Sequence, residues 1–407
     1  KRLFLRSTHT GNHVPIGMMR APRQAPDLLR RDLLYAKASG FNMVRFISGL
    51  AFPYQLDLCD EIGLMVYEES LAAWLLADSP QMGERFDRSL KEMILRDRNH
   101  PSLTIWGVLN ETFDGPVFQH AISTLPLVRN LDETRLVLLS SGRWDNHPEI
   151  GSVCNPGSSE WEHVWGKEAP GAAPGPKPGK DWMLESLGAV IGGYVEGAGD
   201  AHVYPFYGLP QTQAVSQFIR TLGQGTKPVF LSEYGIGSLL NAIRETRLYE
   251  QVKANPELED FALMQSMAER LASDWSRYGM KDVYPFPEDM LLDSQRLMAR
   301  QRRLGFDVIR SNPNICGYNL TGMLDHALTG EGPWTFWREW KPAIMDALQD
   351  GWAPLRWCLF AEPLHVYVGR PLRLEAVLAN EDVLRPGQYP ARFRVMGPAG
   401  IGWEQKT

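Results

Sequence analysis

The segment from Pro101 to Glu111 constrains the fold of this chain more than any other. It follows a turn-like break at Asn99 and His100, because the residue before a proline is held out of the helical region. Its apolar, β-branched run, LTIWGVL, is typical of a strand buried on both faces. The run ends on Asn110 and Glu111. A buried strand that carries an amide and a carboxyl group at its C-terminal end is where a (β/α)8 barrel places its chemistry. The alternative is that Glu111 caps the next helix, because helix starts favour acidic groups.

A second segment, from Lys227 to Gly235, has the same organisation. A short apolar run lies between Pro228 and Gly235 and ends on Glu233. Two carboxyl groups at the mouths of two parallel strands form the pair that retaining glycoside hydrolysis uses, one as acid/base and one as nucleophile, about 5–5.5 Å apart. The two segments together therefore predict a sugar-cleaving site built on Glu111 and Glu233.

The same residues resemble the signatures of glycoside hydrolase family 2. The stretch Arg96–Ser102, continued by Trp106 and Asn110-Glu111, is similar to the acid/base signature of that family, and Lys227–Gly235 is similar to its nucleophile signature. The resemblance covers roughly residues 1 to 400. It implies a (β/α)8 TIM barrel that acts as a retaining, exo-acting β-glycosidase, with Glu111 as acid/base and Glu233 as nucleophile.

Alternating patterns support such a barrel. We expect strands over residues 3–6, 43–47, 63–69, 103–110, 135–140, 200–205, 229–233 and 315–320, and helices over 27–39, 54–61, 84–97, 241–278 and 291–310. Strand–helix–strand alternation at this spacing favours parallel βαβ units.

The resemblance also implies partners for the two glutamates. Arg45 is expected beneath Glu233, where a guanidinium keeps a carboxylate ionised. The alternative is that Arg45 pairs with a core carboxylate such as Glu69, which we also place near the substrate. Asn110 is expected to bind the sugar 2-hydroxyl.

Four further residues complete the predicted substrate site. His202 lies on the sixth strand with Tyr204 two residues later on the same face, although a lone strand histidine is often structural. Asn319 on the last strand is the third, beside Tyr318, where the family usually carries a tryptophan beneath the sugar. Trp337 is the fourth, and it either reaches the mouth or packs between the barrel and the next domain.

The family's sugar-specific motifs are missing from this sequence. The His-Glu pair after strand one, the magnesium motif of bacterial β-galactosidases and the Asn-x-Lys pattern of β-glucuronidases have no match. The sugar therefore stays open, with a β-galactosidase-like activity as the default. A transglycosylase with the same first half-reaction, a carbohydrate-binding scaffold and an inverting hydrolase remain alternatives.

Two segments depart from the barrel pattern. Residues 143–199 form a long insert rich in Pro and Gly, which we expect over the mouth of the barrel. Its aromatic residues either stack on sugars or form a small core of their own: Trp144, Trp161, Trp165, Trp182 and Tyr194. From residue 364 the apolar period becomes two, which predicts a β-sandwich of the immunoglobulin-like type. We therefore expect a catalytic barrel at 1–350 and a partial sandwich, cut short, at 351–407.

Composition limits the other functions. The 407 residues carry a net charge of −6, which gives no electrostatic case for nucleic-acid binding. No apolar run reaches the ~18–20 residues needed to span a bilayer. The four cysteines have no metal-ligand spacing. We therefore expect a glycoside or oligosaccharide as substrate, no cofactor and no metal. A homodimer is possible, the family's N-terminal domains are not in this chain, and the compartment is open.

Overall fold

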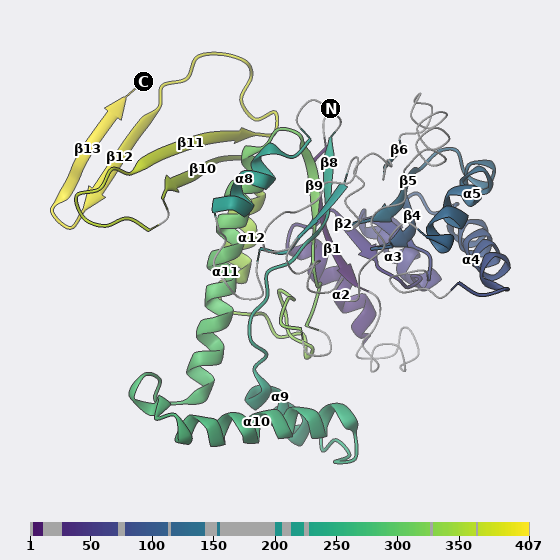
Figure 1. Cartoon of the computed structure of the whole chain (residues 1–407), viewed down its shortest axis with the longest axis horizontal. Helices are drawn as coiled ribbons and strands as arrows, with labels where there is room; N and C mark the ends of the chain where they lie inside the picture. The colour runs from purple at the N-terminus through teal and green to yellow at the C-terminus, as the bar shows by residue number, and fades with distance from the viewer. Residues whose placement is uncertain are drawn as a thin grey trace.

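Eight parallel strands form a nearly closed barrel in this computed structural model (Figure 1). The structure describes residues 3–10, 27–71, 78–112, 115–142, 153–154, 200–205, 213–223, 228–325, 329–363 and 365–406. The barrel strands are β1 (Leu5–Thr10), β2 (Met43–Phe46), β3 (Met65–Glu69), β4 (Leu103–Asn110), β5 (Leu136–Ser141), β7 (Asp200–Val203), β8 (Val229–Tyr234) and β9 (Ile315–Leu320). Their order is β5-β4-β3-β2-β1-β9-β8-β7, and β5 and β7 at the two ends lie in contact. The predicted TIM barrel is confirmed.

A short strand extends the sheet beyond β5. This strand, β6 (Val153–Cys154), pairs with β5 in the antiparallel direction. It is the only part of the predicted insert at 143–199 that the structure describes. The five aromatic residues of that insert lie outside the described residues, so their role stays a prediction.

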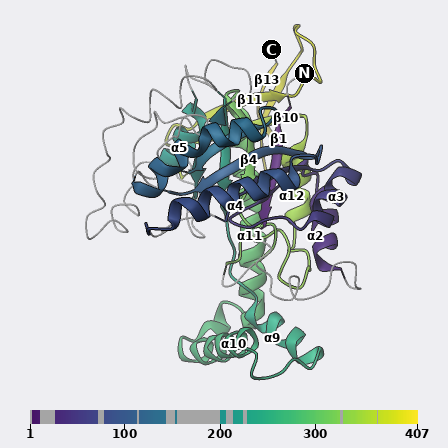
Figure 2. The same cartoon turned by 90° about the vertical axis from the view of Figure 1, so that its right-hand side faces the viewer.

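Helices cover the outside of the barrel and also extend from it. Those that follow strands are α2 (Leu28–Ala38), α3 (Pro53–Ile62), α4 (Met82–Asp97), α5 (Pro116–Leu131), α8 (Gln213–Thr221) and α12 (Ile344–Trp352). Between β8 and β9 the chain forms α9 (Ala242–Gln251), α10 (Glu259–Arg277), a 3-10 turn (Met280–Asp282) and the long α11 (Pro287–Ser311). Figures 1 and 2 show α9 and α10 at the far end of α11, away from the barrel. In the described part of the chain, every helix is too short or too polar to cross a membrane.

Local sequence explains where several elements begin and end. The side chain of Asp27 caps α2 by accepting a hydrogen bond from the backbone N–H of Arg30. Pro53 starts α3, and Gly63 ends it with a positive φ of 67°. The first strand, expected at residues 3–6, in fact runs to Thr10, so His9 lies inside it.

Two apolar clusters hold the barrel together. The larger one packs strands against the surrounding helices. The smaller one contains Met43, Tyr67, Ile105, Leu138 and Phe230, which all come from strands. Because no helix residue takes part in that fully buried set, we place it inside the barrel. A filled interior leaves the C-terminal ends of the strands as the place for a site.

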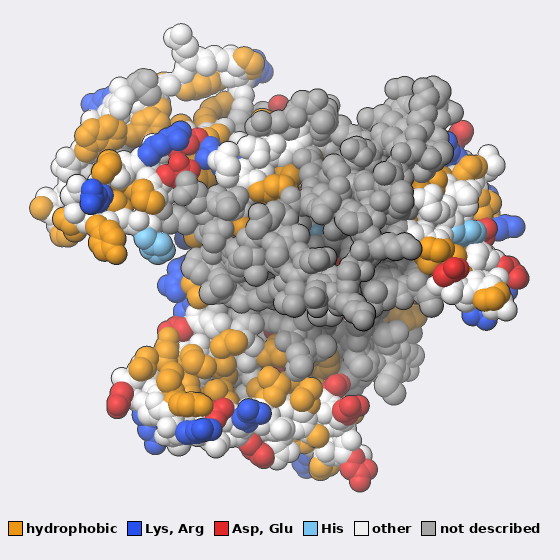
Figure 3. All heavy atoms as spheres, in the orientation of Figure 1, with side chains coloured by type: hydrophobic (Ala, Val, Ile, Leu, Met, Phe, Trp, Pro, Cys, Tyr) orange, Lys and Arg blue, Asp and Glu red, His pale blue; other side chains and the backbone are white. Residues whose placement is uncertain are grey.

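Two antiparallel hairpins follow the barrel. The first pairs β10 (Leu355–Glu362) with β11 (Arg373–Asn380), and the second pairs β12 (Arg392–Gly397) with β13 (Gly400–Lys406). The rings of Trp357 and Phe393 touch across the two hairpins. Hydrophobic side chains gather over these strands in Figure 3. The immunoglobulin-like description and the domain boundary near residue 350 stay predictions.

Candidate active site

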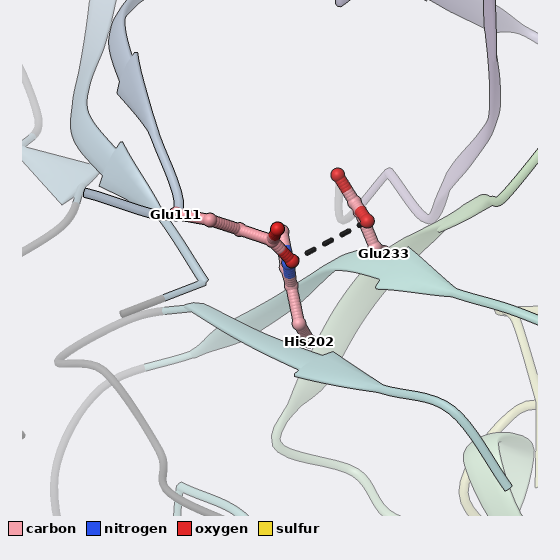
Figure 4. Close-up of side chains that lie close together, drawn as sticks. All are labelled: Glu111, His202 and Glu233. Carbon is pink, nitrogen blue, oxygen red and sulfur yellow. Dashed lines mark hydrogen bonds and ion pairs between the residues drawn. The ribbon is translucent and has the colours of Figure 1, made fainter. Parts of the chain in front are cut away.

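Glu111 directly follows the C-terminal end of β4. Its φ of 47° is in the left-handed region, which a residue with a side chain occupies at an energetic cost of about 1–3 kcal/mol. The backbone N–H of Glu111 donates to the carbonyl oxygen of Ser141 at the end of β5, 2.7 Å away. This bond holds the strained residue in place and turns its side chain into the barrel mouth (Figure 4).

Glu233 lies near the end of β8 and is 3 % exposed. Its Oε1 accepts a hydrogen bond from Nη1 of Arg45 at 3.0 Å. Its Oε2 accepts one from the hydroxyl of Tyr204, which follows β7. One carboxylate oxygen is therefore paired with the Arg45 guanidinium, and the other accepts from the Tyr204 hydroxyl.

His202 joins the two glutamates. Its Nδ1 lies 2.8 Å from Oε1 of Glu111 and 3.5 Å from Oε2 of Glu233. One ligand atom from each of these three residues lies within 4.8 Å of the other two. Figure 4 shows the three side chains directed toward one another from β4, β7 and β8. The two carboxyl groups thus face one common point.

Arg45 organises the floor beneath this pair. The guanidinium is fully buried, and its Nη2 lies 2.6 Å from Oε1 of Glu69. Nη2 also donates to Oδ1 of Asn110 at 2.7 Å and to Oγ of Ser141 at 2.8 Å. Arg45 therefore contacts Glu233 and Glu69 at once, and these are the partners in its two predicted arrangements.

Burial and neighbouring charges shift the pKa values here. Burial raises the pKa of Glu233, opposed by His202 and Arg45 and reinforced by Glu111. Burial lowers the pKa of His202, but Glu233 and Glu111 outweigh it, so the net shift is upward. Burial and the two carboxylates raise the pKa of Tyr204 well above its usual value, which keeps its hydroxyl a donor. A pair of carboxyl groups with a proton shared nearby is suited to acid–base work.

Two other predicted residues make their recorded contacts with groups other than the two glutamates. Asn319 is fully buried on β9, where Nδ2 lies 3.0 Å from Nδ1 of His9. Trp337 packs its ring against Tyr249 of α9 and against Phe336. The recorded contacts of Trp337 are thus with α9 and Phe336, and both roles predicted for it stay predictions.

The sequence reasoning missed three residues beside the site. Ser141 bridges Arg45 and Asn110, donating to the latter's Oδ1 at 2.6 Å. His9 accepts a hydrogen bond from the backbone N–H of Gly322 at 3.2 Å. Glu331, on the loop after β9, lies next to Tyr204. Ser141 could have been found because it directly follows a predicted strand, whereas nothing in the local pattern around Glu331 indicates its position.

The same cluster offers ligand atoms of the kind that bind divalent metals. Glu111, His202 and Glu233 each supply one oxygen or nitrogen atom. These atoms are already engaged with one another and with Arg45 and Tyr204. The arrangement is therefore suited to sharing protons as it stands.

Comparison with known proteins agrees with this geometry. The family model described as "Glycosyl hydrolases family 2, TIM barrel domain" matches residues 23–171. A β-galactosidase of Thermoanaerobacter pseudethanolicus is 37% identical over 120 residues, which are 28% of this chain and 14% of that protein. A β-galactosidase of Bacteroides ovatus is 34% identical over 91 residues, which are 21% of this chain and 11% of that protein. The matched part of the chain thus spans a small share of these relatives.

Solved structures show the same fold. A β-galacturonidase from Eisenbergiella tayi has a TM-score of 0.53 at 17% identity, covering 86% of this chain and 51% of that one. A β-D-mannosidase from Dictyoglomus thermophilum has a TM-score of 0.56 at 15% identity, covering 100% of this chain and 45% of that one. Residues 23–171 thus match the barrel domain of glycoside hydrolase family 2, and the barrel fold and the facing glutamates of the chain agree with that match.

Proposed function

We propose that this chain carries the catalytic barrel of a retaining, exo-acting β-glycoside hydrolase. The observation that supports it is the placement of Glu111 and Glu233, whose facing carboxylate oxygens lie within 4.8 Å. Retaining enzymes hold their carboxyl groups about 5–5.5 Å apart, and inverting enzymes about 6.5–9.5 Å. The short separation leaves no room for a water molecule between nucleophile and sugar, so a covalent intermediate is favoured.

In the first step, Glu233 attacks the anomeric carbon and the C–O bond to the leaving group breaks. Glu111 gives its proton to the leaving oxygen, and a glycosyl ester forms on Glu233. In the second step, Glu111 takes a proton from water, whose oxygen attacks the same carbon and releases Glu233. The hydroxyl of Tyr204 and the guanidinium of Arg45 hold the Glu233 carboxylate, one on each oxygen.

The hydrogen bonds of Asn110 support its predicted role as a substrate contact. Its Oδ1 accepts hydrogen bonds from Arg45 and Ser141, so the amide cannot turn without losing both. Its Nδ2 is buried with no partner among the described residues. A buried amide donor without a partner is energetically unfavourable. We infer that a sugar hydroxyl, the 2-hydroxyl in this mechanism, accepts from it.

The sugar itself is the finer part of the proposal. The β-galactosidases among the relatives make a β-galactoside the first substrate to test. We propose that a terminal β-linked sugar is released from a small glycoside. The chain aligns with only part of each relative. The experiment must therefore also establish that this chain is active.

Azide rescue tests the mechanism with the two glutamates as each other's control. On a panel of 4-nitrophenyl β-glycosides, Glu233→Ala and Glu111→Ala should each lose most of the activity. Azide should then restore turnover in both variants. The Glu111→Ala product should be the β-glycosyl azide, and the Glu233→Ala product the α-glycosyl azide. Products of the same configuration from the two variants, or an unaffected Glu233→Ala enzyme, would contradict the proposal.

A further inference from the structure

A third carboxylate, that of Glu331, lies at the same mouth of the barrel. Glycine backbone surrounds its side chain, since a Cβ built on Gly235 would lie 2.7 Å from Oε1 of Glu331. A Cβ on Gly322 would lie 3.1 Å from its Cβ, and one on Gly237 3.4 Å from its Cγ. Gly235 comes two residues after Glu233, so the Glu331 carboxylate lies beside the nucleophile's own strand.

Tyr204 connects Glu331 to the reacting groups. The same Cβ on Gly235 would also lie 2.3 Å from Cδ1 of Tyr204, so the tyrosine ring and the Glu331 carboxylate share one small space. The hydroxyl of that ring donates to Glu233. Glu331 is partly exposed, unlike the buried Glu233. The Glu331 carboxylate therefore lies beside the carboxyl pair, with Tyr204 between them.

The cations around this mouth are bound to other groups. Arg302 of α11 donates to the backbone oxygens of Ile236 and Glu331, at 2.7 and 2.8 Å, and not to the Glu331 carboxylate. Lys341 pairs with Asp325 at 2.7 Å. Arg45 and His202 are held by the other carboxylates of the site, as described above. Among the described residues, none of these cations forms an ion pair with the Glu331 carboxylate, although the charge of Arg302 lies close enough to lower its pKa.

We propose that Glu331 is a specificity-determining residue that makes the site select neutral sugars and reject uronic acids. The inference rests on the proposed function and deepens it by naming the substrate class. A uronic acid differs from its neutral sugar by a carboxylate on C5, which is ionised at neutral pH. Two like charges a few ångströms apart at a partly exposed site repel by an amount that corresponds to about tenfold or more in affinity.

The titration of Glu331 gives the inference a pH signature. Burial raises the pKa of Glu331 to about 7, with Arg302 and Lys341 opposing and Glu233 and Asp325 adding to the rise. Tyr204 is the other titratable group packed against it. The Glu331 carboxyl group therefore gains its charge as the pH rises through neutrality. The rejection of a uronic acid must grow over the same range.

The experiment compares 4-nitrophenyl β-D-galactoside with 4-nitrophenyl β-D-galacturonide, and the corresponding glucoside with its glucuronide. The ratio of kcat/KM within each pair is measured from about pH 5.5 to about pH 8.5, on either side of neutrality. Titration of Glu111, Glu233 and His202 also changes the charge that a uronic acid meets, so only the part of the pH dependence that is lost in Glu331→Gln is assigned to Glu331. The wild-type chain should favour the neutral sugar by about tenfold or more, and increasingly as the pH rises. Glu331→Gln should reduce that preference several-fold and reduce its pH dependence.

A matched control uses Glu339→Gln in the same segment of the chain. Glu339 pairs with Arg244 at 2.7 Å on the surface, and its side chain is 39% exposed. This variant should keep the wild-type ratio and pH profile. A wild-type preference for the uronide, or an unchanged ratio in Glu331→Gln, overturns the inference.

Binding separates this inference from the proposed function. If no glycoside is hydrolysed, the proposed function fails. Ligand-observed NMR with D-galactose and D-galacturonate then tests Glu331 alone. Weaker binding of D-galacturonate in the wild type than in Glu331→Gln, with the difference growing as the pH rises, supports it. Equal binding of the acid to both proteins contradicts it.

Discussion

Arg45 and Glu233 meet across the floor of the barrel, with Nη1 3.0 Å from Oε1. The arginine comes from β2 and the glutamate from β8, 188 residues later. Because the same guanidinium holds Glu69 and Asn110, the position of the proposed nucleophile depends on one buried cation. Stability and chemistry are therefore coupled at this residue.

Replacing Arg45 by methionine should reduce both stability and activity. The change leaves Glu69 and Glu233 buried without their cation, which should lower the free energy of unfolding by about 3–5 kcal/mol. Arg45 stabilises the ionised form of Glu233, so its removal raises the pKa of that carboxyl group. The acidic limb of the pH–rate profile should therefore move to higher pH. Urea unfolding and kcat/KM against pH measure the two effects.

Two further variants make this prediction specific. Arg45→Lys keeps the charge and should recover part of the pH shift, although not the geometry of the forked contacts. Arg296→Met removes an exposed arginine that pairs with Asp293 on α11. It should change the stability by less than about 0.5 kcal/mol. A similar loss in Arg296→Met and Arg45→Met would show that the buried cation has no special role.

The protonation of His202, which lies between two carboxylates, can be measured directly. Its raised pKa should keep the imidazolium present above about pH 6.5, where a free histidine titrates. In Glu111→Gln one of the two carboxylates is gone, so the pKa of His202 should fall, by about one unit or more. Histidine side-chain NMR over the pH range, with His202→Asn for assignment, measures both values. An unchanged titration in Glu111→Gln would mean that the 2.8 Å contact carries no charge interaction.

The proposed catalytic and positioning residues of this site can be predicted from the sequence where they lie on or directly after a strand. Glu111, Glu233 and Arg45 lie on or directly after buried apolar runs, and the ends of parallel strands must meet at one edge of a barrel. The eight strands were predicted to within a few residues for the same reason, apart from β1. There the polar run Ser7-Thr8-His9 concealed a strand whose side chains are buried by neighbours from β2 and β9.

Residues on long loops were not predictable in this way. Glu331 reaches the site because the glycine backbone at Gly235 and Gly322 leaves space for its side chain. That space depends on how loops after two different strands approach each other, which no local pattern records. Trp337 was predicted either to reach the mouth or to pack between the barrel and the next domain. Its contacts with Tyr249 depend on the α9–α11 insertion, whose packing the sequence does not show.

Gly107 tests how tightly the floor of the site is packed. A Cβ on this β4 residue would lie 2.3 Å from Cγ of Glu69 and 2.7 Å from Cε2 of Tyr67. Gly107→Ala should therefore displace Glu69 from Arg45 and lower the free energy of unfolding by about 1–3 kcal/mol. Gly115→Ala is the control, because its Cβ would meet nothing within 4 Å. Thermal melting and kcat should both fall for the first variant and stay near wild type for the second.

The role of Asn110 can be tested by changing the protein and the substrate in the same experiment. If its Nδ2 donates to the sugar 2-hydroxyl, Asn110→Ala should reduce kcat/KM on the parent glycoside by about 10²–10³, the loss typical of one donor that acts in the transition state. A 2-deoxy substrate lacks the acceptor, so on it the same variant should lose much less. The wild-type enzyme should discriminate between the two substrates, and the variant should do so only weakly. Equal losses on both substrates would show that Asn110 acts through Arg45 and Ser141, as a support for the floor, and not through the sugar.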